Sequence, residues 1–203
     1  MFDEEQAPSY GITEATWERN ENQTATFSND GDADIMEIAD PFWTIDVRVA
    51  VLSRAHFDHW DSFLARRNLS ESSFTIWRSL RVRPRDPLIV NDTGLVITSY
   101  NPAASTLTLG GYGAGRAAHY GDMISYRTAA NGYWAGQVQA PAVADGAGAC
   151  TVSVWPRPWA PHAAAPAPKR FYALGEFRLS KKPKVKEGFN DWDIRFEAEQ
   201  VLR

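Results

Sequence analysis

The stretch Trp43-Thr-Ile-Asp-Val-Arg-Val-Ala-Val51 alternates apolar and polar side chains and leads directly into Arg54-Ala-His-Phe-Asp-His-Trp-Asp-Ser-Phe-Leu-Ala-Arg-Arg67. The alternation predicts a half-buried β-strand. In the second stretch apolar residues recur at helical spacing behind Ser53, a typical N-cap residue, so we expect an amphipathic helix over about residues 54–67. The core side chains expected from these two elements are Trp43, Ile45, Val47, Val49, Phe57, Trp60, Phe63 and Leu64.

Short apolar runs follow the helix at intervals of about ten residues, and Gly, Pro, Asn or Asp separates most of them. In the last run, Trp192, Ile194 and Phe196 are expected to face the core, because charged residues alternate with them. The predicted strands cover residues 74–77, 88–90, 95–97, 106–109, 123–126, 136–138, 151–155, 176–179 and 192–198. This pattern predicts a mainly β fold, an antiparallel β-sandwich or barrel with one amphipathic α-helix.

A chain of 203 residues can form one domain or two small ones. The stretch Ala160 to Pro168 has no periodicity and is rich in Ala and Pro, which is typical of a stiff, extended connector. We expect a β-rich body over residues 1–160, followed by a connector and C-terminal β-hairpin over residues 161–203 that packs on the body. A single domain is the alternative.

The composition bears on location and on redox chemistry. The longest uncharged stretch, Thr93 to Gly115, contains a proline and five glycines, so we expect no membrane-spanning helix and no stable membrane insertion. The acidic start of the chain, without an apolar segment behind it, predicts that there is no secretory signal peptide. The one cysteine, Cys150, excludes an internal disulfide and a thiolate zinc cluster.

Charge is distributed unevenly along the chain. Residues 1–40 hold eleven acidic residues and one basic residue, whereas residues 169–203 hold six acidic and nine basic residues. Complementary charges of this kind can direct the assembly of neighbouring copies. We therefore predict that the acidic segment 1–40 and the basic segment 178–186 lie near boundaries with neighbouring subunits or with other partners. The candidate interface residues are Asp30, Asp32, Asp34, Arg81, Arg83, Arg85, Lys181, Lys182, Lys184 and Lys186.

A metal site is the most tempting chemical interpretation. The sequence Arg54-Ala-His56-Phe-Asp58-His59 looks like the metal-binding loop of metallo-β-lactamase-type hydrolases with its first histidine replaced, and His119 and His162 could supply later ligands. Such a loop must be irregular for its ligands to converge, whereas these residues continue without a break into the predicted helix. We therefore expect no bound metal and regard a metallo-hydrolase as the second alternative function.

Other catalytic patterns are incomplete. Residues 110–117 nearly fit a phosphate-binding loop, but Arg116 and Ala117 stand where Lys and Ser or Thr are needed. Cys150 lies in an alternating strand pattern typical of a small buried residue. The basic runs at 78–85 and 181–186 lack the interleaved aromatic residues of a nucleic-acid surface. We expect a protein with no catalytic residues and no cofactor that does not recognise nucleic acid.

The order of several short blocks resembles the distal tail protein family, structural proteins at the tail tip of tailed bacteriophages. The blocks are Gly11-Ile-Thr-Glu-Ala-Thr-Trp17, the strand and helix above, Tyr120-Gly-Asp-Met-Ile-Ser-Tyr126, Val143-Ala-Asp-Gly-Ala-Gly-Ala-Cys-Thr-Val-Ser-Val154 and Trp192-Asp-Ile-Arg-Phe-Glu-Ala-Glu199. The resemblance implies a β-rich, non-enzymatic virion protein at the distal end of the tail, assembled in the host cytoplasm as part of a baseplate or tail tip.

The resemblance also implies partners. A ring of identical copies is expected, with a hexamer favoured and a trimer as the alternative, placed between the tail tube and the hub or fibre proteins. The alternative function from the residues themselves is carbohydrate or receptor binding, with Tyr112, Tyr133 and Trp134 in glycine-rich surroundings available to stack on sugar rings.

Overall fold

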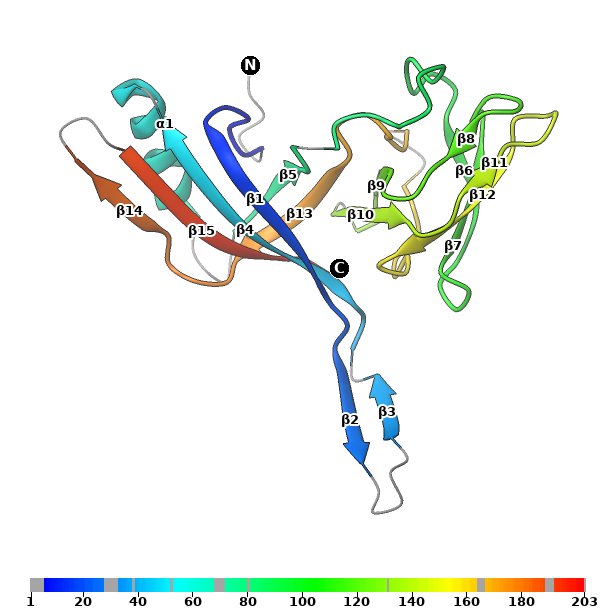
Figure 1. Cartoon of the computed structure of the whole chain (residues 1–203), viewed down its shortest axis with the longest axis horizontal. Coiled ribbons are helices and arrows are strands. Elements are labelled where there is room, and N and C mark those ends of the chain that lie inside the picture. The colour runs from blue at the N-terminus through cyan, green and yellow to red at the C-terminus, as the bar shows by residue number, and fades with distance from the viewer. Residues whose placement is uncertain are drawn as a thin grey trace.

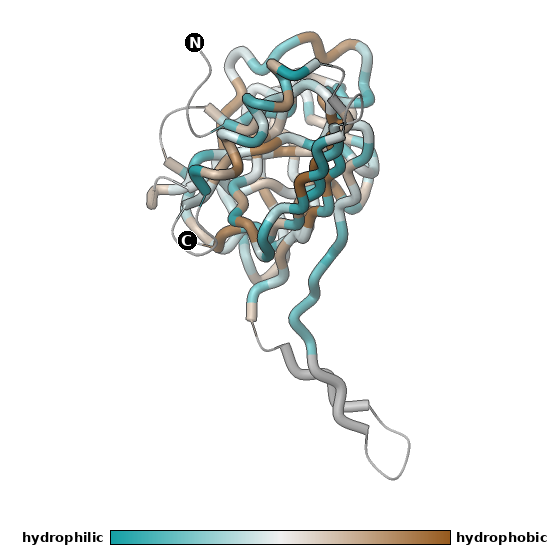
Figure 2. The backbone as a smooth tube through the Cα atoms, turned by 90° about the vertical axis from the view of Figure 1, so that its left-hand side faces the viewer, coloured by the Kyte–Doolittle hydropathy of each residue, from teal (hydrophilic) through white to brown (hydrophobic). Residues whose placement is uncertain are grey.

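The structure is a computed structural model that describes residues 6–27, 33–37, 39–51, 53–67, 72–79, 81–130, 132–163, 167–188 and 192–202, with only the backbone of residues 24–27, 33–37 and 51. Its strands pair antiparallel and form two larger sheets (Figure 1), which confirms the predicted mainly β, antiparallel fold class. Along the strands of the body, hydrophilic and hydrophobic residues alternate (Figure 2).

The larger sheet has six strands and a strong curl (Figure 1). Its order is β1-β4-β15-β13-β5, and β14 pairs with the first half of β15. The C-terminal residues 174–200 therefore contribute strands to the same sheet as the N-terminal β1 and β4. The strands are β1 (Ile12–Asn20), β4 (Phe42–Val51), β5 (Ser73–Trp77), β13 (Leu174–Leu179), β14 (Lys184–Glu187) and β15 (Trp192–Gln200).

Helix α1 (Arg54–Ala65) covers one face of this sheet. Ser53 caps it, because its hydroxyl accepts a hydrogen bond from the amide of His56 at 3.3 Å. The helix ends two residues before the predicted end at residue 67. The Arg67 amide donates to the carbonyl of Leu64 at 3.0 Å, which closes a tighter final turn.

The core between α1 and the sheet is aromatic. The ring of Trp60 lies 5.8 Å from that of Phe196 on β15, and the ring of Phe63 lies 5.7 Å from that of Phe74 on β5. Trp192 is only partly buried and lies against Phe57 at the end of the cluster. The core residues that were predicted from the sequence and are buried in the structure are Trp43, Ile45, Val47, Val49, Phe57, Trp60, Phe63, Leu64, Ile194 and Phe196.

A second sheet of five strands has the order β6-β7-β12-β10-β9 and its own core, centred on Leu107, Trp134 and Val152. Strands β10 and β13 meet where the two sheets join, and Gln200 of β15 donates to the carbonyl of Ala135 at 3.3 Å there. The strands are β6 (Val96–Asn101), β7 (Thr106–Gly110), β9 (Met123–Arg127), β10 (Tyr133–Val138) and β12 (Cys150–Trp155), with a small ribbon of β8 (Ala117–Ala118) and β11 (Ala142–Val143) beside them.

Two further features differ from the sequence prediction. Residues 88–90 form no strand, because Asp86 holds this segment in a turn by accepting from the amide of Leu88 at 2.9 Å. Strands β2 (Gln23–Phe27) and β3 (Ala33–Glu37) were not predicted, and they form a two-stranded sheet that extends the β1–β4 pair beyond the body (Figure 1).

Candidate interaction surface

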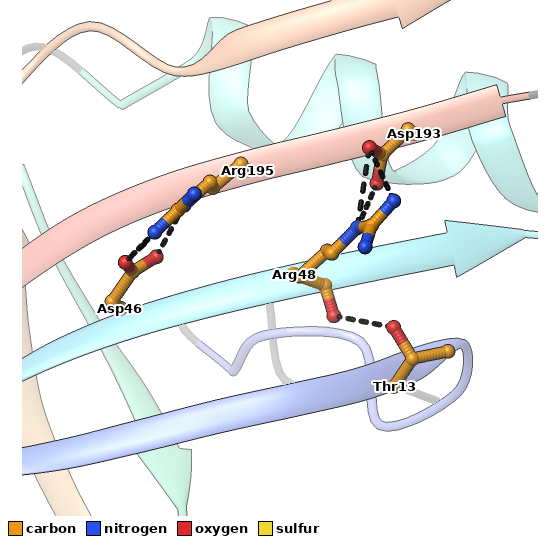
Figure 3. Close-up of polar contacts among 5 residues, drawn as sticks. All are labelled: Thr13, Asp46, Arg48, Asp193 and Arg195. Carbon is orange, nitrogen blue, oxygen red and sulfur yellow. Dashed lines mark hydrogen bonds and ion pairs between the residues drawn. The ribbon is translucent and has the colours of Figure 1, made fainter.

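The face of the six-stranded sheet that points away from α1 carries a regular set of ion pairs. Arg48 of β4 donates to both carboxylate oxygens of Asp193 on β15, with Nε–Oδ1 and Nη2–Oδ2 distances of 3.0 Å. One step along the strands, Arg195 of β15 pairs with Asp46 of β4, with an Nε–Oδ1 distance of 2.9 Å. Figure 3 shows both guanidinium groups on the open side of the sheet, with the helix behind it.

The pattern continues to the other strands. Arg178 of β13 pairs with Glu199 of β15, and Lys181 in the turn after β13 pairs with Glu197, both at 2.7 Å. The ion pairs between β4 and β15 are diagonal, because Arg48 lies directly opposite Arg195 in the register. We call this surface the outer face. Each pair is exposed to water and adds little stability, so the pairs chiefly define a patterned, hydrated surface.

Neighbouring charges on this surface stabilise the ionised forms of Asp46 and Arg195. The hydrogen bond from Arg195, followed by the positive charges of Arg195, Lys184 and Lys181, lowers the pKa of Asp46, although partial burial of the carboxylate opposes the shift. The same contact raises the pKa of Arg195. A cavity of about 230 Å³ on this face is lined by both charge signs, from Glu14, Thr16, Glu18, Asp46, Arg48 and Arg195.

Within the described residues this sheet has three terminal strands, of which β5 bridges to Gln6 through Thr75, while β1 and β14 have open edges. Strand β1 pairs only with β4, and strand β14 pairs only with β15. Exposed residues of β1 include Glu14 and Glu18, whereas all four residues of β14 are exposed and include Lys184 and Lys186. One open edge therefore carries acidic residues and the other carries lysines.

The predicted interface residues fall into three groups. Lys181, Lys182, Lys184 and Lys186 lie together in the turn before β14 and on β14 itself, at the lysine edge. Asp30 and Asp32 lie outside the described residues, and for Asp34 on β3 only the backbone is described. The arginine run does not form one surface. Arg83 and Arg85 line a cavity of about 380 Å³ with Phe171, whereas Arg81 lies beside Gly121 and Gln137.

The histidines of the metal hypothesis lie on different elements. His56 and His59 belong to α1, where both rings lie against Tyr10, at centroid distances of 4.3 and 5.7 Å, and His59 also hydrogen-bonds to the Tyr10 hydroxyl. His119 lies in the turn before β9, and His162 pairs with Thr128 at the end of that strand. Among the described residues, no three His, Cys, Asp or Glu side chains are grouped so that they could hold a metal ion.

Two of the three aromatic residues considered for sugar binding are buried. Tyr112 and Trp134 belong to the core of the five-stranded sheet, and Trp134 stacks on Tyr126 at 4.9 Å. Tyr133 is partly exposed. Cys150 is also buried in this core, and burial raises the pKa of its thiol, which disfavours the reactive thiolate.

Comparison with known proteins adds no relative: no protein-family model and no curated protein matches the chain. In the part of the chain that the structure describes, no helix is both long and apolar enough to cross a bilayer.

The sequence predicts the outer face only in part. Alternation in β4 and β15 indicates which side chains leave the core, but the pairing of Arg48 with Asp193 depends on strand register.

Proposed function

We propose that this protein is a non-enzymatic structural component of a bacteriophage tail tip, similar to distal tail proteins, and that copies of it assemble into a ring. The observation that carries the proposal is the opposite charge of the two open edges of one curled sheet. In this proposal the ring is a hexamer that joins the tail tube to the hub or adsorption apparatus, and the protein acts by holding other proteins in place.

The two edges favour a contact between different surfaces of neighbouring copies. Open strand edges present unpaired amide and carbonyl groups that can pair with another chain. Pairing β1 with β14 brings Glu14 and Glu18 toward Lys184 and Lys186, whereas pairing either strand with its own copy loses this contact between the two glutamates and the two lysines. A contact between two different surfaces generates a closed ring when the rotation between copies returns to the start.

The β2–β3 hairpin supplies a second contact in the same proposal. Residues 21–40 contain six acidic residues and no basic one. The hairpin forms its own two-stranded sheet beyond the body, so it reaches farther than the edge strands (Figure 1). An acidic arm of this kind is suited to a basic surface on an adjoining copy or on a neighbouring tail protein.

Charge reversal on the lysine edge tests the proposal. The variant Lys181→Glu, Lys182→Glu, Lys184→Glu and Lys186→Glu is expected to weaken self-assembly by about tenfold or more, since it places acidic residues on both edges. Assembly is measured by native mass spectrometry and by light scattering of the purified full chain at low and high salt.

A matched control places the same kind of change elsewhere. The variant Arg54→Glu and Arg66→Glu alters exposed arginines at the two ends of α1, on the face of the sheet opposite the ion pairs, and should assemble like the original protein. Assembly and salt dependence that stay unchanged in the lysine variant would contradict the proposal.

A further inference from the structure

Three arginine side chains gather where the two sheets join. Arg19 at the end of β1 donates to the side-chain oxygens of Gln137 and Gln139 at 3.3 and 2.7 Å. Arg78, directly after β5, lies over the ring of Trp43 at 5.9 Å, and Arg81 follows in the same loop. The charges of Arg19 and Arg81 both act on Arg78, so the three guanidinium groups share one electrostatic environment, which we call the arginine cluster.

The arginine cluster has no acidic counter-charge within the described residues. Ion pairs of other arginines are well formed there, but none involves Arg19, Arg78 or Arg81. Glu21 is nearby in sequence, yet its carboxylate accepts from the indole nitrogen of Trp155 at 3.1 Å. The three positive charges therefore have no carboxylate partner among the described residues. Two of them lie over indole rings, Arg78 over Trp43 and Arg19 over Trp155.

Arg78 is the arginine of the cluster with an unpaired buried donor and a destabilised charge. Its Nη1 atom is buried and has no acceptor, which is rare for a buried donor. Burial lowers the pKa of Arg78, and the positive charges of Arg81 and Arg19 lower it further. An arginine nonetheless keeps its charge, because its unperturbed pKa is above about 12. The cluster is therefore suited to a negatively charged ligand that accepts several hydrogen bonds.

Gly121 lets two side chains of the cluster approach the backbone closely. A Cβ atom at Gly121 would lie 3.2 Å from Nε2 of Gln137 and 3.7 Å from the Cζ atom of Arg81. Gln137 uses its side-chain oxygen to accept from Arg19, so its amide nitrogen, which lies near Gly121, can act as a donor. The Arg81 guanidinium and the Gln137 amide thus lie close together at Gly121, and the side-chain oxygen of Gln137 links them to Arg19 of β1.

We propose that Arg19, Arg78 and Arg81, together with the amide of Gln137, bind an oxyanion of the phosphate class. A tetrahedral dianion offers acceptors in several directions and carries more charge than a single carboxylate, which matches three guanidinium groups. The ligand is either inorganic phosphate or the phosphate group of a small molecule. This inference goes beyond the proposed function and does not depend on it.

Titration calorimetry of the full chain with sodium phosphate, at constant ionic strength against sodium chloride, tests the inference. We expect saturable phosphate binding that weakens about tenfold or more in Arg81→Gln and in Arg78→Gln. Arg83→Gln is the matched control, because Arg83 is exposed in the same loop and lines the separate cavity with Phe171. Its phosphate affinity should equal that of the original protein.

The remaining measurements separate the alternatives. If Arg78→Gln does not fold, as judged by its thermal unfolding curve, Arg81→Gln carries the test, since Arg81 is only partly buried. A nucleoside monophosphate that binds as tightly as phosphate, or more tightly, supports the inference and distinguishes the free ion from a phosphorylated molecule. The inference is overturned if phosphate binds no better than chloride, if acetate binds equally well, or if Arg81→Gln leaves phosphate affinity unchanged.

Discussion

The two faces of the six-stranded sheet are built from the same strands but behave as opposites. On one face, Trp43, Val47 and Phe196 are almost completely buried. Phe196 packs against Trp60 of α1, and Trp43 packs against Trp155 of the second sheet. On the other face, residues that alternate with the buried ones, such as Asp46 and Arg195, form exposed ion pairs. A period of two along each strand therefore separates a face that stabilises the protein from a face that remains available for contact.

The difference explains how the protein can have so patterned a surface without depending on it for stability. Burial of apolar side chains is the dominant favourable contribution to the free energy of folding, whereas exposed ion pairs contribute little each. The outer face and its two edges can thus be altered with small effects on folding. This separation makes the charged surface a good subject for tests of assembly.

The largest effect is expected from the buried face. Trp60→Ala should lower the free energy of unfolding by about 3–5 kcal/mol, because Trp60 is fully buried and its removal leaves a cavity between α1 and Phe196. Urea unfolding followed by circular dichroism measures this change. Asp61→Ala, on the exposed side of the same helix, should change stability by no more than about 0.5 kcal/mol. Equal losses in the two variants would remove the distinction between the faces.

A much smaller effect is expected from the outer face. Arg48→Gln should reduce the free energy of unfolding by no more than about 1 kcal/mol, because its contact with Asp193 is solvent-exposed. The loss should shrink further at 1 M salt, at which exposed charges are screened within about 3 Å. Urea unfolding at two salt concentrations provides the measurement. A loss as large as that of Trp60→Ala would show that the outer face is a stabilising element.

The smallest effect concerns pH and Asp46. The folded protein lowers the pKa of this carboxyl below its ordinary value of about 3.9, so the contribution of Asp46 is present above that pH and is lost as pH falls through the lowered pKa. Stability should therefore fall more steeply with acid in the original protein than in Asp46→Asn. Unfolding curves between about pH 5 and pH 2 would reveal the difference. Parallel acid dependence in both proteins would contradict it.

The sequence predicts elements that lie on a clean period and misses those whose period is broken. Apolar residues recur every second position in strand β4 and at helical spacing in α1. Both elements were predicted to within two residues at their ends. Strand β1 has an irregular register between Ile12 and Glu14, and Trp17 is its one buried residue in the described structure, so its alternation is hidden. Strand β14 has no buried residue, and only its pairing with β15 identifies it as a strand.

The candidate surface could be predicted only where its residues are close together in the sequence. The lysines of residues 181–186 are conspicuous in the sequence, and they lie together because the segment is short. The arginines of residues 81–85 are equally close in sequence, but Pro84 and Asp86 turn the loop, and Arg81 joins a different environment from Arg83. The pairing of Arg48 with Asp193 joins residues 145 positions apart, which local pattern cannot reveal.

Swapping charge between the two open edges tests the account most directly. Lys184→Glu with Lys186→Glu makes both edges acidic, and Glu14→Lys with Glu18→Lys makes both edges basic. Sedimentation velocity should find that neither variant assembles alone, while an equimolar mixture regains the assembled mass of the unaltered protein, because acidic and basic edges alternate around the proposed ring. Full-size complexes from either variant alone, or a mixture that stays dissociated when the unaltered protein assembles, would contradict pairing of β1 with β14.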